Sequence, residues 1–410
     1  MRATTVTERL EGLRLVLTDA ELKEVRDVLV ARGRDGMAHE GAEIAMIPAW
    51  LAPPARGLAG EAVAIDAGGT HLRAARVLLQ PGRAPEVVSA VAQAPLPGAA
   101  GREPAARAEF FAAHAEVVAA CGAERTTPIG YCFSYPIQSR PDGDAVLLKW
   151  TKEVRVADVV GVPVGQALRE GLAAEGLEVG PVVVLNDTIA TLLGGSLAPG
   201  ADAARAVGLI VGTGTNLGAF LRGADLGKLG AAAEAWPRMA VNFESGAYDV
   251  PGLGLIDAVV DETSLNPGQQ RFEKAVSGAY LGRIFSAAAP ELDVRLDGPV
   301  DTARVSQLAG SGRDSAAVLL ARALVQRSAD LVAAALAASH ALVDAGGPLY
   351  VCAEGTLFWQ APGYADRVAA TLDRLLAGRG PGARGFVSRA DNANLAGSAV
   401  AALSHARQQG

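Results

Sequence analysis

Short apolar runs alternate with glycine-rich turns through most of the chain, and longer apolar patterns lie between them. A short apolar run that ends at a turn is typical of a buried strand, whereas apolar positions three or four residues apart over a longer stretch are typical of a helix. Strands are predicted within residues 62–79, 128–137, 182–187, 206–221 and 348–358. Helices are predicted at residues 19–32, 105–121, 163–175, 315–343 and 395–409. This mixture predicts an α/β protein.

Two of the predicted strand–turn–strand segments carry the same short motif. Residues 69–74 read GTHLRA and residues 214–219 read GTNLGA, and each motif follows an apolar strand. A shared pattern this short also arises by chance, so on its own it only suggests a relation. We interpret the two motifs as equivalent hairpin turns in two related lobes.

Both turns have the composition of a phosphate-binding loop. Glycine permits positive φ angles and a close approach of the backbone to a ligand, and successive N–H groups then hold phosphate oxygens. Thr70, Thr213 and Thr215 add hydroxyl donors. Neither turn contains the GKS or GKT of a Walker loop, and a strand rather than a helix follows each turn, which argues against a dinucleotide-binding fingerprint. For either turn alone, an ordinary hairpin is an equally good interpretation.

An acidic residue precedes the first turn. Asp66 lies at the end of the predicted strand, just before Gly68 and Gly69. A carboxylate beside a phosphate is repulsive unless a cation lies between them, and Mg²⁺ held largely through water removes the conflict. Arg73 follows the turn and is predicted to contact the transferring phosphoryl group through its planar guanidinium.

Composition and charge limit the classes of function without selecting one. Half of the 410 residues are hydrophobic and the formal net charge is −7, so no nucleic-acid partner is expected. The three cysteines are far apart, as in a reduced cytoplasmic protein, and the five histidines show no zinc-ligand spacing. The sequence shows neither a signal-peptide core nor a membrane-spanning apolar run, so no membrane partner is expected.

Taken together, the motifs resemble those of the eukaryotic-type hexokinase/glucokinase family, within the sugar kinase–actin–Hsp70 superfamily. The resemblance runs from about residue 45 to the C-terminus. It is carried by IDAGGTHLR at 65–73, FSYPIQ at 133–138, WTKE at 150–153, LNDT at 185–188, GLIVGTGTN at 208–216, NFESGAYD at 242–249, SLNPGQQRFEKAVSGAYLGR at 264–283 and CAEGTLF at 352–358. No single motif is decisive, but their shared order is a strong signal.

Several positions depart from the family pattern. Ser245 stands in place of the usual Trp, Asp249 in place of Gly, His71 in place of Asn, Ala361 in place of His, and residues 354–356 read Glu-Gly-Thr in place of Asp-Gly-Ser. These positions support the sugar pocket and the nucleotide side. Sugar preference and the identity of the phosphoryl donor therefore stay open.

The resemblance implies an α/β chain with the two-lobed actin-like ATPase (ribonuclease H-like) fold, in which helices flank mixed sheets and a cleft separates the lobes. It places residues 61–187 and 394–410 in a small domain, and residues 1–60 and 188–393 in a large domain. A hexose that bridges the lobes implies closure of the cleft on sugar binding.

The resemblance also implies a hexokinase that transfers the γ-phosphoryl group of Mg-ATP to the 6-hydroxyl of a hexose, with glucose as the expected sugar. Asp187 is the implied general base, and Lys152 and Arg73 are the other implied catalytic residues. The implied hexose ligands are Ser134, Thr151, Lys152, Asn186, Asp187, Asn216, Glu244 and Glu273. The implied nucleotide contacts are Asp66, which binds Mg²⁺ through water, Gly68, Gly69, Thr70, Arg73, Gly212, Thr213, Gly214, Gly278, Thr302, Ser306, Gly355 and Thr356.

Simpler roles stay open for several of these residues. Asp187 could cap the helix that follows it, and Glu273 could be a charge on a helix face. Glu244 and Lys152 could lie in solvent. The alternative functions are a kinase that prefers mannose, fructose or glucosamine, and a non-catalytic sugar- or nucleotide-binding regulator of the same fold. An actin- or chaperone-like switch would not need the hexose ligands. A monomer or a homodimer is expected.

Overall fold

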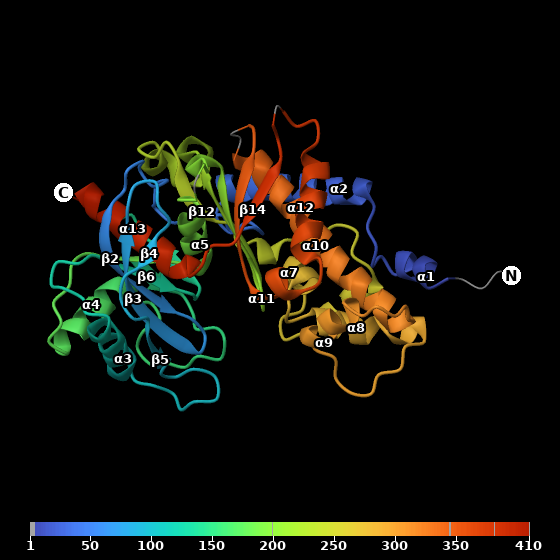
Figure 1. Cartoon of the computed structure of the whole chain (residues 1–410), viewed down its shortest axis with the longest axis horizontal. Helices are drawn as coiled ribbons and strands as arrows, with labels where there is room; N and C mark the ends of the chain where they lie inside the picture. The colour runs from blue at the N-terminus through green and yellow to red at the C-terminus, as the bar shows by residue number, and fades with distance from the viewer. Residues whose placement is uncertain (1–4, 199, 344–345, 381, 410) are drawn as a thin grey trace.

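Two halves, each built around a mixed β-sheet flanked by helices, make up the protein (Figure 1). The computed structural model describes residues 5–198, 200–343, 346–380 and 382–409. Helix α1 (Val6–Gly12) and the end of helix α13 (Ala393–Gln409) lie in different halves, at opposite ends of the long axis. The α/β class and the mixed, helix-flanked sheets are as predicted.

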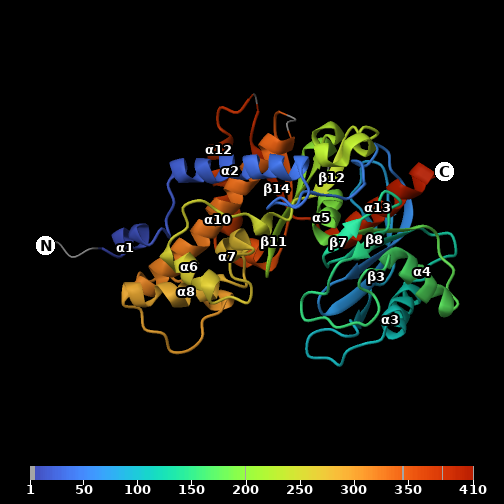
Figure 2. The same ribbon diagram turned by 180° about the vertical axis from the view of Figure 1, so that it is seen from behind.

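The sheet of the first half has the order β4-β3-β2-β6-β9, and β5 also pairs with β3. Its strands are β2 (Gly60–Ala67), β3 (His71–Leu79), β4 (Glu86–Val87), β5 (Ala92–Pro95), β6 (Ile129–Phe133) and β9 (Val182–Leu185). Strands β2 and β3 form an antiparallel hairpin, whereas β6 and β9 run parallel to β2. A separate hairpin of β7 (Ile137–Ser139) and β8 (Ala145–Leu147) is seen from behind in Figure 2.

Strand β2 is buried on both faces, because successive side chains of a strand point to opposite sides of the sheet. Val63 and Ile65 pack with helices α3 (Arg107–Ala120) and α4 (Val164–Ala174). Ala64 packs on the other side, with helix α13. Burial on both faces explains why this strand reads as an almost continuous apolar run.

The sheet of the second half has the order β1-β12-β11-β10-β13-β14. Its strands are β1 (Ile47–Pro48), β10 (Ala206–Val211), β11 (Thr215–Leu221), β12 (Met239–Asn242), β13 (Leu349–Glu354) and β14 (Gly385–Ser388). Besides α1, the helices of this half are α2 (Asp19–Ala38), α6 (Leu255–Glu262), α7 (Arg271–Val276), α8 (Leu281–Ala288), α9 (Thr302–Ala309), α10 (Ala316–Val343), α11 (Thr356–Gln360) and α12 (Tyr364–Leu376). Short 3₁₀ turns lie at Ala203–Arg205, Gly223–Asp225, Gly227–Ala233, Ser245–Ala247 and Pro290–Leu292. The long helix α10 is flanked by α2 and α12 (Figure 2).

Helix α2 begins where the sequence predicted but ends later. Thr18 accepts a hydrogen bond from the Glu21 N–H, and the Glu21 carboxylate accepts one from the Thr18 N–H, which forms a capping box. The helix continues to Ala38 rather than stopping near residue 32. Gly33 interrupts the apolar pattern, yet a Cβ placed there would lie 2.8 Å from Leu342 of α10. This glycine therefore permits close helix packing rather than ending the helix.

Helices α5 (Asp187–Gly195) and α13 cross between the two sheets, where their apolar side chains share one core with residues of both sheets. Glycines permit the close approach. A Cβ placed on Gly397 of α13 would lie 1.8 Å from the Ala190 carbonyl oxygen of α5. A Cβ placed on Gly208 of β10 would lie 2.6 Å from the Thr188 carbonyl oxygen. Small residues thus fix how helix α5, which begins at Asp187, sits against both halves.

The Gly397→Ala substitution should therefore destabilise the protein although alanine favours helices. The added methyl group overlaps the Ala190 backbone, and overpacking of this kind costs about 1–3 kcal/mol or more. Urea denaturation measures the loss. Gly312→Ala is the matched control, because a Cβ at Gly312 meets no atom within 4 Å. Equal stability of the two variants would contradict the close crossing.

Candidate active site

The carboxyl ends of three parallel strands meet at one edge of the first sheet. Asp66 of β2 is in register with Cys132 of β6, and Cys132 is in register with Leu185 of β9. Parallel neighbours lie about 4.8 Å apart, so this row spans roughly 10 Å. Ser134 follows β6 and Asp187 follows β9 at the same edge. Residues far apart in the sequence are thereby brought close together.

Asp187 is the first residue of helix α5, and Asn186 is its N-cap. The Asn186 Oδ1 accepts the Thr188 N–H at 2.8 Å, and the Asp187 Oδ1 accepts the same N–H at 2.8 Å. The capping role considered for Asp187 therefore belongs mainly to Asn186. Both side chains are half-buried, so the Asp187 carboxylate is not sealed inside the protein.

The WTKE motif at residues 150–153 contacts the FSYPIQ motif at residues 133–138. Lys152 Nζ donates to the Ser134 carbonyl oxygen at 2.8 Å and lies 5.6 Å from the centre of the Tyr135 ring. The Tyr135 hydroxyl donates to the Gly68 carbonyl oxygen at 2.6 Å. Lys152 has a φ of +57°, a strained value for a lysine, and the neighbouring Thr151 is half-buried. Lys152 is thus held by specific contacts beside the first phosphate turn, although the residue is exposed.

An amide network holds the hexose-ligand candidates of the second half. Asn216 Nδ2 donates to Asn242 Oδ1 at 2.7 Å, and Asn242 Nδ2 donates to Glu244 Oε1 at 2.6 Å. Asn216 Oδ1 accepts the Ser245 N–H at 3.2 Å. Asn242 is buried, and it was missing from the predicted ligands. The NFESG motif contained it, but its role depends on the pairing of β11 with β12.

Glu273 lies against the second phosphate turn. Its Oε2 accepts the Thr215 N–H at 3.2 Å, and a Cβ placed on Gly214 would lie 2.6 Å from the same oxygen. The side chain is half-buried rather than spread over a solvated helix face. The position of Glu273 fits a ligand role better than a surface charge.

The carboxylates in this region share an unfavourable environment. Burial raises the pKa of Glu244, the Asn242 amide opposes the rise, and the charges of Asp187 and Glu273 add to it. Burial also raises the pKa of Glu273, while the Thr215 N–H opposes the rise. The Asp187 charge therefore acts on Glu244 of the other half. Buried acceptors of this kind suit a ligand that offers hydroxyl donors.

The Glu244→Gln substitution should stabilise the protein at neutral pH while weakening hexose binding. The folded-state pKa of Glu244 lies above its ordinary value of 4.5, so wild-type stability falls as the pH rises from 4.5 through the raised pKa. Glutamine carries no charge, so its advantage should grow over the same window. Urea denaturation between about pH 4.5 and pH 8 measures this difference. The exposed Glu262→Gln variant is the control. If the difference in unfolding free energy between Glu244→Gln and the wild type did not change with pH, the prediction would be wrong.

Asp66 and Arg73 face each other across the first hairpin. They are a register pair of β2 and β3, and Arg73 Nη2 donates to Asp66 Oδ2 at 2.5 Å. Asp66 is buried, and Asn394 at the start of helix α13 donates to its other oxygen at 3.5 Å. Thr70 at the turn is exposed and contacts His71 Nδ1 at 2.9 Å. The predicted acidic and basic partners of the phosphate turn are therefore adjacent.

The second hairpin turn brings together most of the predicted nucleotide contacts. The Gly212 N–H bonds to the Gly214 carbonyl oxygen at 2.9 Å, and the Gly278 N–H bonds to the Gly212 carbonyl oxygen at 2.7 Å. Thr302 donates to the Gly278 carbonyl oxygen. A Cβ placed on Gly212 would lie 3.5 Å from the Gly355 Cα.

Three more of the predicted nucleotide contacts lie in the second turn or on helices close to it. Thr213 is exposed, and its carbonyl oxygen accepts the Ala279 N–H at 3.1 Å. Thr356 is exposed at the start of helix α11, and its backbone nitrogen would lie 3.8 Å from a Cβ on Gly212. Ser306 is half-buried in helix α9, beyond Thr302.

One expectation about these turns was wrong. Gly68, Gly69, Gly212 and Gly214 do not adopt positive φ angles. Their benefit is space: a Cβ on Gly69 would lie 3.1 Å from the Lys152 side chain, and one on Gly214 would touch Glu273. These glycines keep the side-chain volume low between each turn and the candidate hexose ligands.

Two sequence models of the hexokinase family match this chain, the first over residues 11–197 and the second over residues 206–293 and 303–404. The chain belongs to the hexokinase family. Hexokinase-1 of Oryza sativa subsp. japonica is 34% identical over 283 residues, which make up 65% of this chain and 55% of the rice protein. Hexokinase-1 of Saccharomyces cerevisiae is 31% identical over 63% of this chain and 55% of the yeast protein. The chain thus spans about half the length of these relatives.

Solved hexokinase structures share the fold over nearly the whole chain. A hexokinase from Schistosoma mansoni complexed with glucose has a TM-score of 0.80 and 24% identity, with 97% of this chain and 98% of that chain covered. A ROK family glucokinase from Streptomyces griseus is less similar, with a TM-score of 0.53 and 22% identity. The first likeness confirms the predicted actin-like sugar-kinase fold.

Some positions that depart from the hexokinase pattern have local consequences. Ser245 is buried, and its Oγ has no hydrogen-bond partner among the residues that the structure describes. Asp249 forms a 2.9 Å ion pair with Arg271. Ala361 is also buried. Ser245 and Asp249 lie in the segment after Glu244, whereas Ala361 follows helix α11.

The residues around Asp66 fit an indirectly bound Mg²⁺. In the described parts of the chain, no group of three or more His, Cys, Asp or Glu side chains could enclose a metal ion. Mg²⁺ in phosphoryl-transfer sites typically keeps several waters and uses one or two carboxylates together with substrate phosphates. Asp66 supplies such a single carboxylate next to the first turn.

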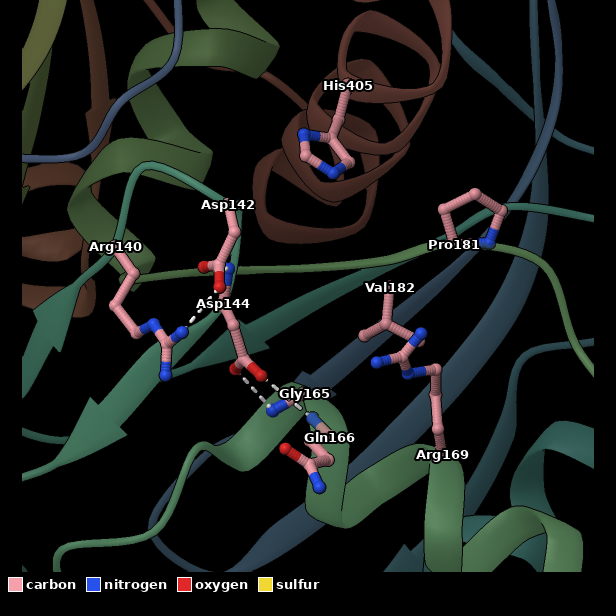
Figure 3. A pocket seen from close by; sticks show the side chains of 9 residues that line it. All are labelled: Arg140, Asp142, Asp144, Gly165, Gln166, Arg169, Pro181, Val182 and His405. Atoms are coloured by element: carbon pink, nitrogen blue, oxygen red, sulfur yellow. Dashed lines mark hydrogen bonds and ion pairs between the residues drawn. The ribbon is translucent and has the colours of Figure 1, made fainter. Parts of the chain in front are cut away.

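A separate cavity lies at the far end of strand β9 in this hexokinase-family fold (Figure 3). It has a volume of about 220 Å³ and is lined by Val182 at the start of β9, whereas Asp187 follows the end of that strand. Asp144 caps helix α4 there by accepting the Gly165 N–H at 2.6 Å. Arg140 pairs with Asp142 at 2.6 Å. This cavity is distinct from the candidate active site.

Proposed function

We propose that this protein is an ATP-dependent hexose 6-phosphotransferase with glucose as the expected sugar. The observation that carries the proposal is that Glu244 of the other half lies close enough to both Asp187 and Glu273 for their charges to raise its pKa. Asp66 and the first glycine turn lie at the same sheet edge as Asp187. An actin-like nucleotide switch has no use for this set of buried oxygen and amide groups.

Asp187 would act as the general base. Its carboxylate takes the proton of the hexose 6-hydroxyl while that oxygen bonds to the γ-phosphorus of ATP and the bond to ADP breaks. Asn186, Asn216, Glu244 and Glu273 would pair the other hydroxyls, together with Ser134, Thr151 and Lys152. A site that pairs every hydroxyl rejects a wrong epimer, because a buried group is then left unpaired.

The two turns and Arg73 would hold the nucleotide phosphates. Arg73 would exchange its Asp66 partner for the transferring phosphoryl group, with Mg²⁺ taking the place beside Asp66. Bound Mg²⁺ supplies neutralisation of the phosphate charge. Gly278, Thr302, Ser306, Gly355 and Thr356 would lie on the adenosine side. Hexose binding would draw the halves together and exclude water as a competing acceptor.

The location and assembly of the protein are inferred from simpler features. The cysteines Cys121, Cys132 and Cys352 are all buried and unpaired, which suits a reducing cytoplasm. Among the described residues, none of the helices combines the length and apolar character needed to cross a membrane. A monomer or a homodimer is proposed.

A coupled assay of ADP release over a panel of hexoses tests the proposal. We expect turnover that depends on hexose and magnesium, with glucose the best substrate. Preference for mannose, fructose or glucosamine would redirect the specificity and leave the reaction class intact. Absence of turnover with every hexose, together with ATP hydrolysis stimulated by a protein partner, would contradict the proposal.

A further inference from the structure

A buried ion pair lies directly beside Glu273. Lys274 Nζ donates to Asp261 Oδ1 at 2.6 Å, and the two side chains are only 4% and 14% exposed. Taking two charges out of water costs several kcal/mol each, which their attraction repays only in good geometry. Such a pair is a weak source of net stability. Its position points instead to a role in fixing local geometry.

The pair holds the turn that precedes helix α7. The Asp261 carboxylate accepts the Gly268 N–H at 2.9 Å, and Lys274 Nζ also donates to the Asn266 carbonyl oxygen at 2.7 Å. Burial alone would raise the pKa of Asp261, but Lys274 and the Gly268 N–H hold it below its usual value. The charged pair therefore joins helix α6, the turn at 266–268 and helix α7 at one point.

Helix α7 is attached to both proposed ligand regions. At its start, the Phe272 N–H donates to the Tyr248 carbonyl oxygen at 2.9 Å, in the segment that follows Glu244. Just after its end, the Gly278 N–H donates to the Gly212 carbonyl oxygen at 2.7 Å in the second phosphate turn. A displacement of α7 would therefore move both the segment after Glu244, on the proposed hexose side, and the second phosphate turn.

Glu273 has little freedom between these attachments. Its carboxylate accepts the Thr215 N–H at 3.2 Å and packs against Gly214. Lys274 is the next residue on the same helix. Its bonds to Asp261 and to the Asn266 carbonyl oxygen therefore fix the position and rotation of helix α7, and with them the position of the Glu273 side chain. In a preorganised site, a misplacement of a functional group by about 1 Å can lower the reaction rate by up to about 10²-fold.

We propose that the Asp261–Lys274 pair is a positioning element that holds Glu273 at the junction between the hexose and the second phosphate turn. The inference rests on the proposed hexose-binding function. Neither residue of the pair is among the proposed hexose or nucleotide ligands. Both act through Glu273, so their effect should disappear when the Glu273 carboxylate is removed.

A double-mutant cycle on glucose affinity, measured by calorimetric titration of the full-length chain, tests this dependence. Lys274→Met should raise the glucose Kd by about 10-fold, within the range of coupling found between residues of one contact network. In a Glu273→Gln background the same change should alter the Kd by less than about 2-fold, because no carboxylate is left to position. Arg283→Met on the next helix, α8, is the control; it removes an exposed cation and should change the Kd by less than about 2-fold.

A second variant separates positioning from folding. Asp261→Leu combined with Lys274→Met replaces the pair by apolar side chains, which often preserves stability. We expect it to fold, as judged by urea denaturation, and to retain the raised glucose Kd. Wild-type glucose affinity in the double variant, or equal Kd changes with and without Glu273, would overturn the inference. If glucose binding shows the expected coupling between Lys274 and Glu273 but the protein releases no ADP, the kinase proposal is refuted. The positioning role of the pair would still be supported.

Discussion

Replacement of Asp187 by asparagine should lower the turnover number by about 10²–10⁴-fold, the range that a positioned general base supplies. Asparagine keeps an oxygen that can accept the Thr188 N–H, so helix α5 should still begin at the same place. It cannot take the proton of the hexose hydroxyl. Glucose affinity should therefore change by only a few-fold while catalysis collapses. ADP release at saturating glucose and ATP, together with a glucose titration, separates the two quantities.

The exposed Asp314→Asn variant is the control for this substitution, because Asp314 is 74% exposed and forms a surface ion pair with Arg322. It should retain wild-type turnover. Hexose-dependent turnover that survives in Asp187→Asn at near wild-type rate would remove the base assignment. Loss of glucose binding without loss of the maximal rate would assign Asp187 to binding alone.

The Arg327→Met substitution should cause the largest loss of stability, about 3–5 kcal/mol, which is typical of breaking one side of a buried ion pair. Arg327 donates to both oxygens of Asp257 at 2.8 and 2.7 Å, and their side chains are 0% and 6% exposed. Methionine fills much of the same volume but leaves the Asp257 charge buried and uncompensated. Urea denaturation measures the difference.

Two further variants serve as a control and as a rescue for this prediction. Arg374→Met removes an exposed pair with Asp19 and should cost no more than about 1 kcal/mol. Adding Asp257→Leu to Arg327→Met should recover part of the loss, because the unpaired charge is then gone. A cost for Arg327→Met as small as that for Arg374→Met would show that the Asp257–Arg327 pair is not held as described.

The strand–turn–strand segments could be predicted from sequence because their signals are local. An apolar run ending in Asp66 and followed by two glycines predicts a strand and a tight turn without any knowledge of the partner strands. The same holds for Val211, where β10 ends before the second turn. The family resemblance then supplied the roles of Asp187 and the glutamates, which periodicity alone could not.

Contacts between segments that are distant in the sequence could not be predicted from the sequence pattern. Asn242 reads as an ordinary residue at the end of a strand, and only the pairing of β12 with β11 brings it between Asn216 and Glu244. Asn394 likewise lies just before the small-residue helix predicted at residues 395–409, and no local signal marks it. It reaches Asp66 because helix α13 returns to the first sheet from the far end of the chain.

The glycines show how a correct residue can be assigned an incorrect reason. Composition favoured positive φ angles at the phosphate turns, but the backbone there is compatible with other residues. What excludes a side chain is a neighbour, such as Glu273 beside Gly214. Steric constraints of this kind depend on the folded partners and leave no periodic trace in the sequence.

Transfer of label from [γ-³²P]ATP to glucose, compared with 6-deoxyglucose, tests the central claim most directly. The account predicts labelled glucose 6-phosphate, and no labelled sugar from 6-deoxyglucose, because the acceptor oxygen is then missing. Release of labelled phosphate with neither sugar labelled, or equal labelling of both sugars, would contradict an Asp187-assisted attack by the 6-hydroxyl.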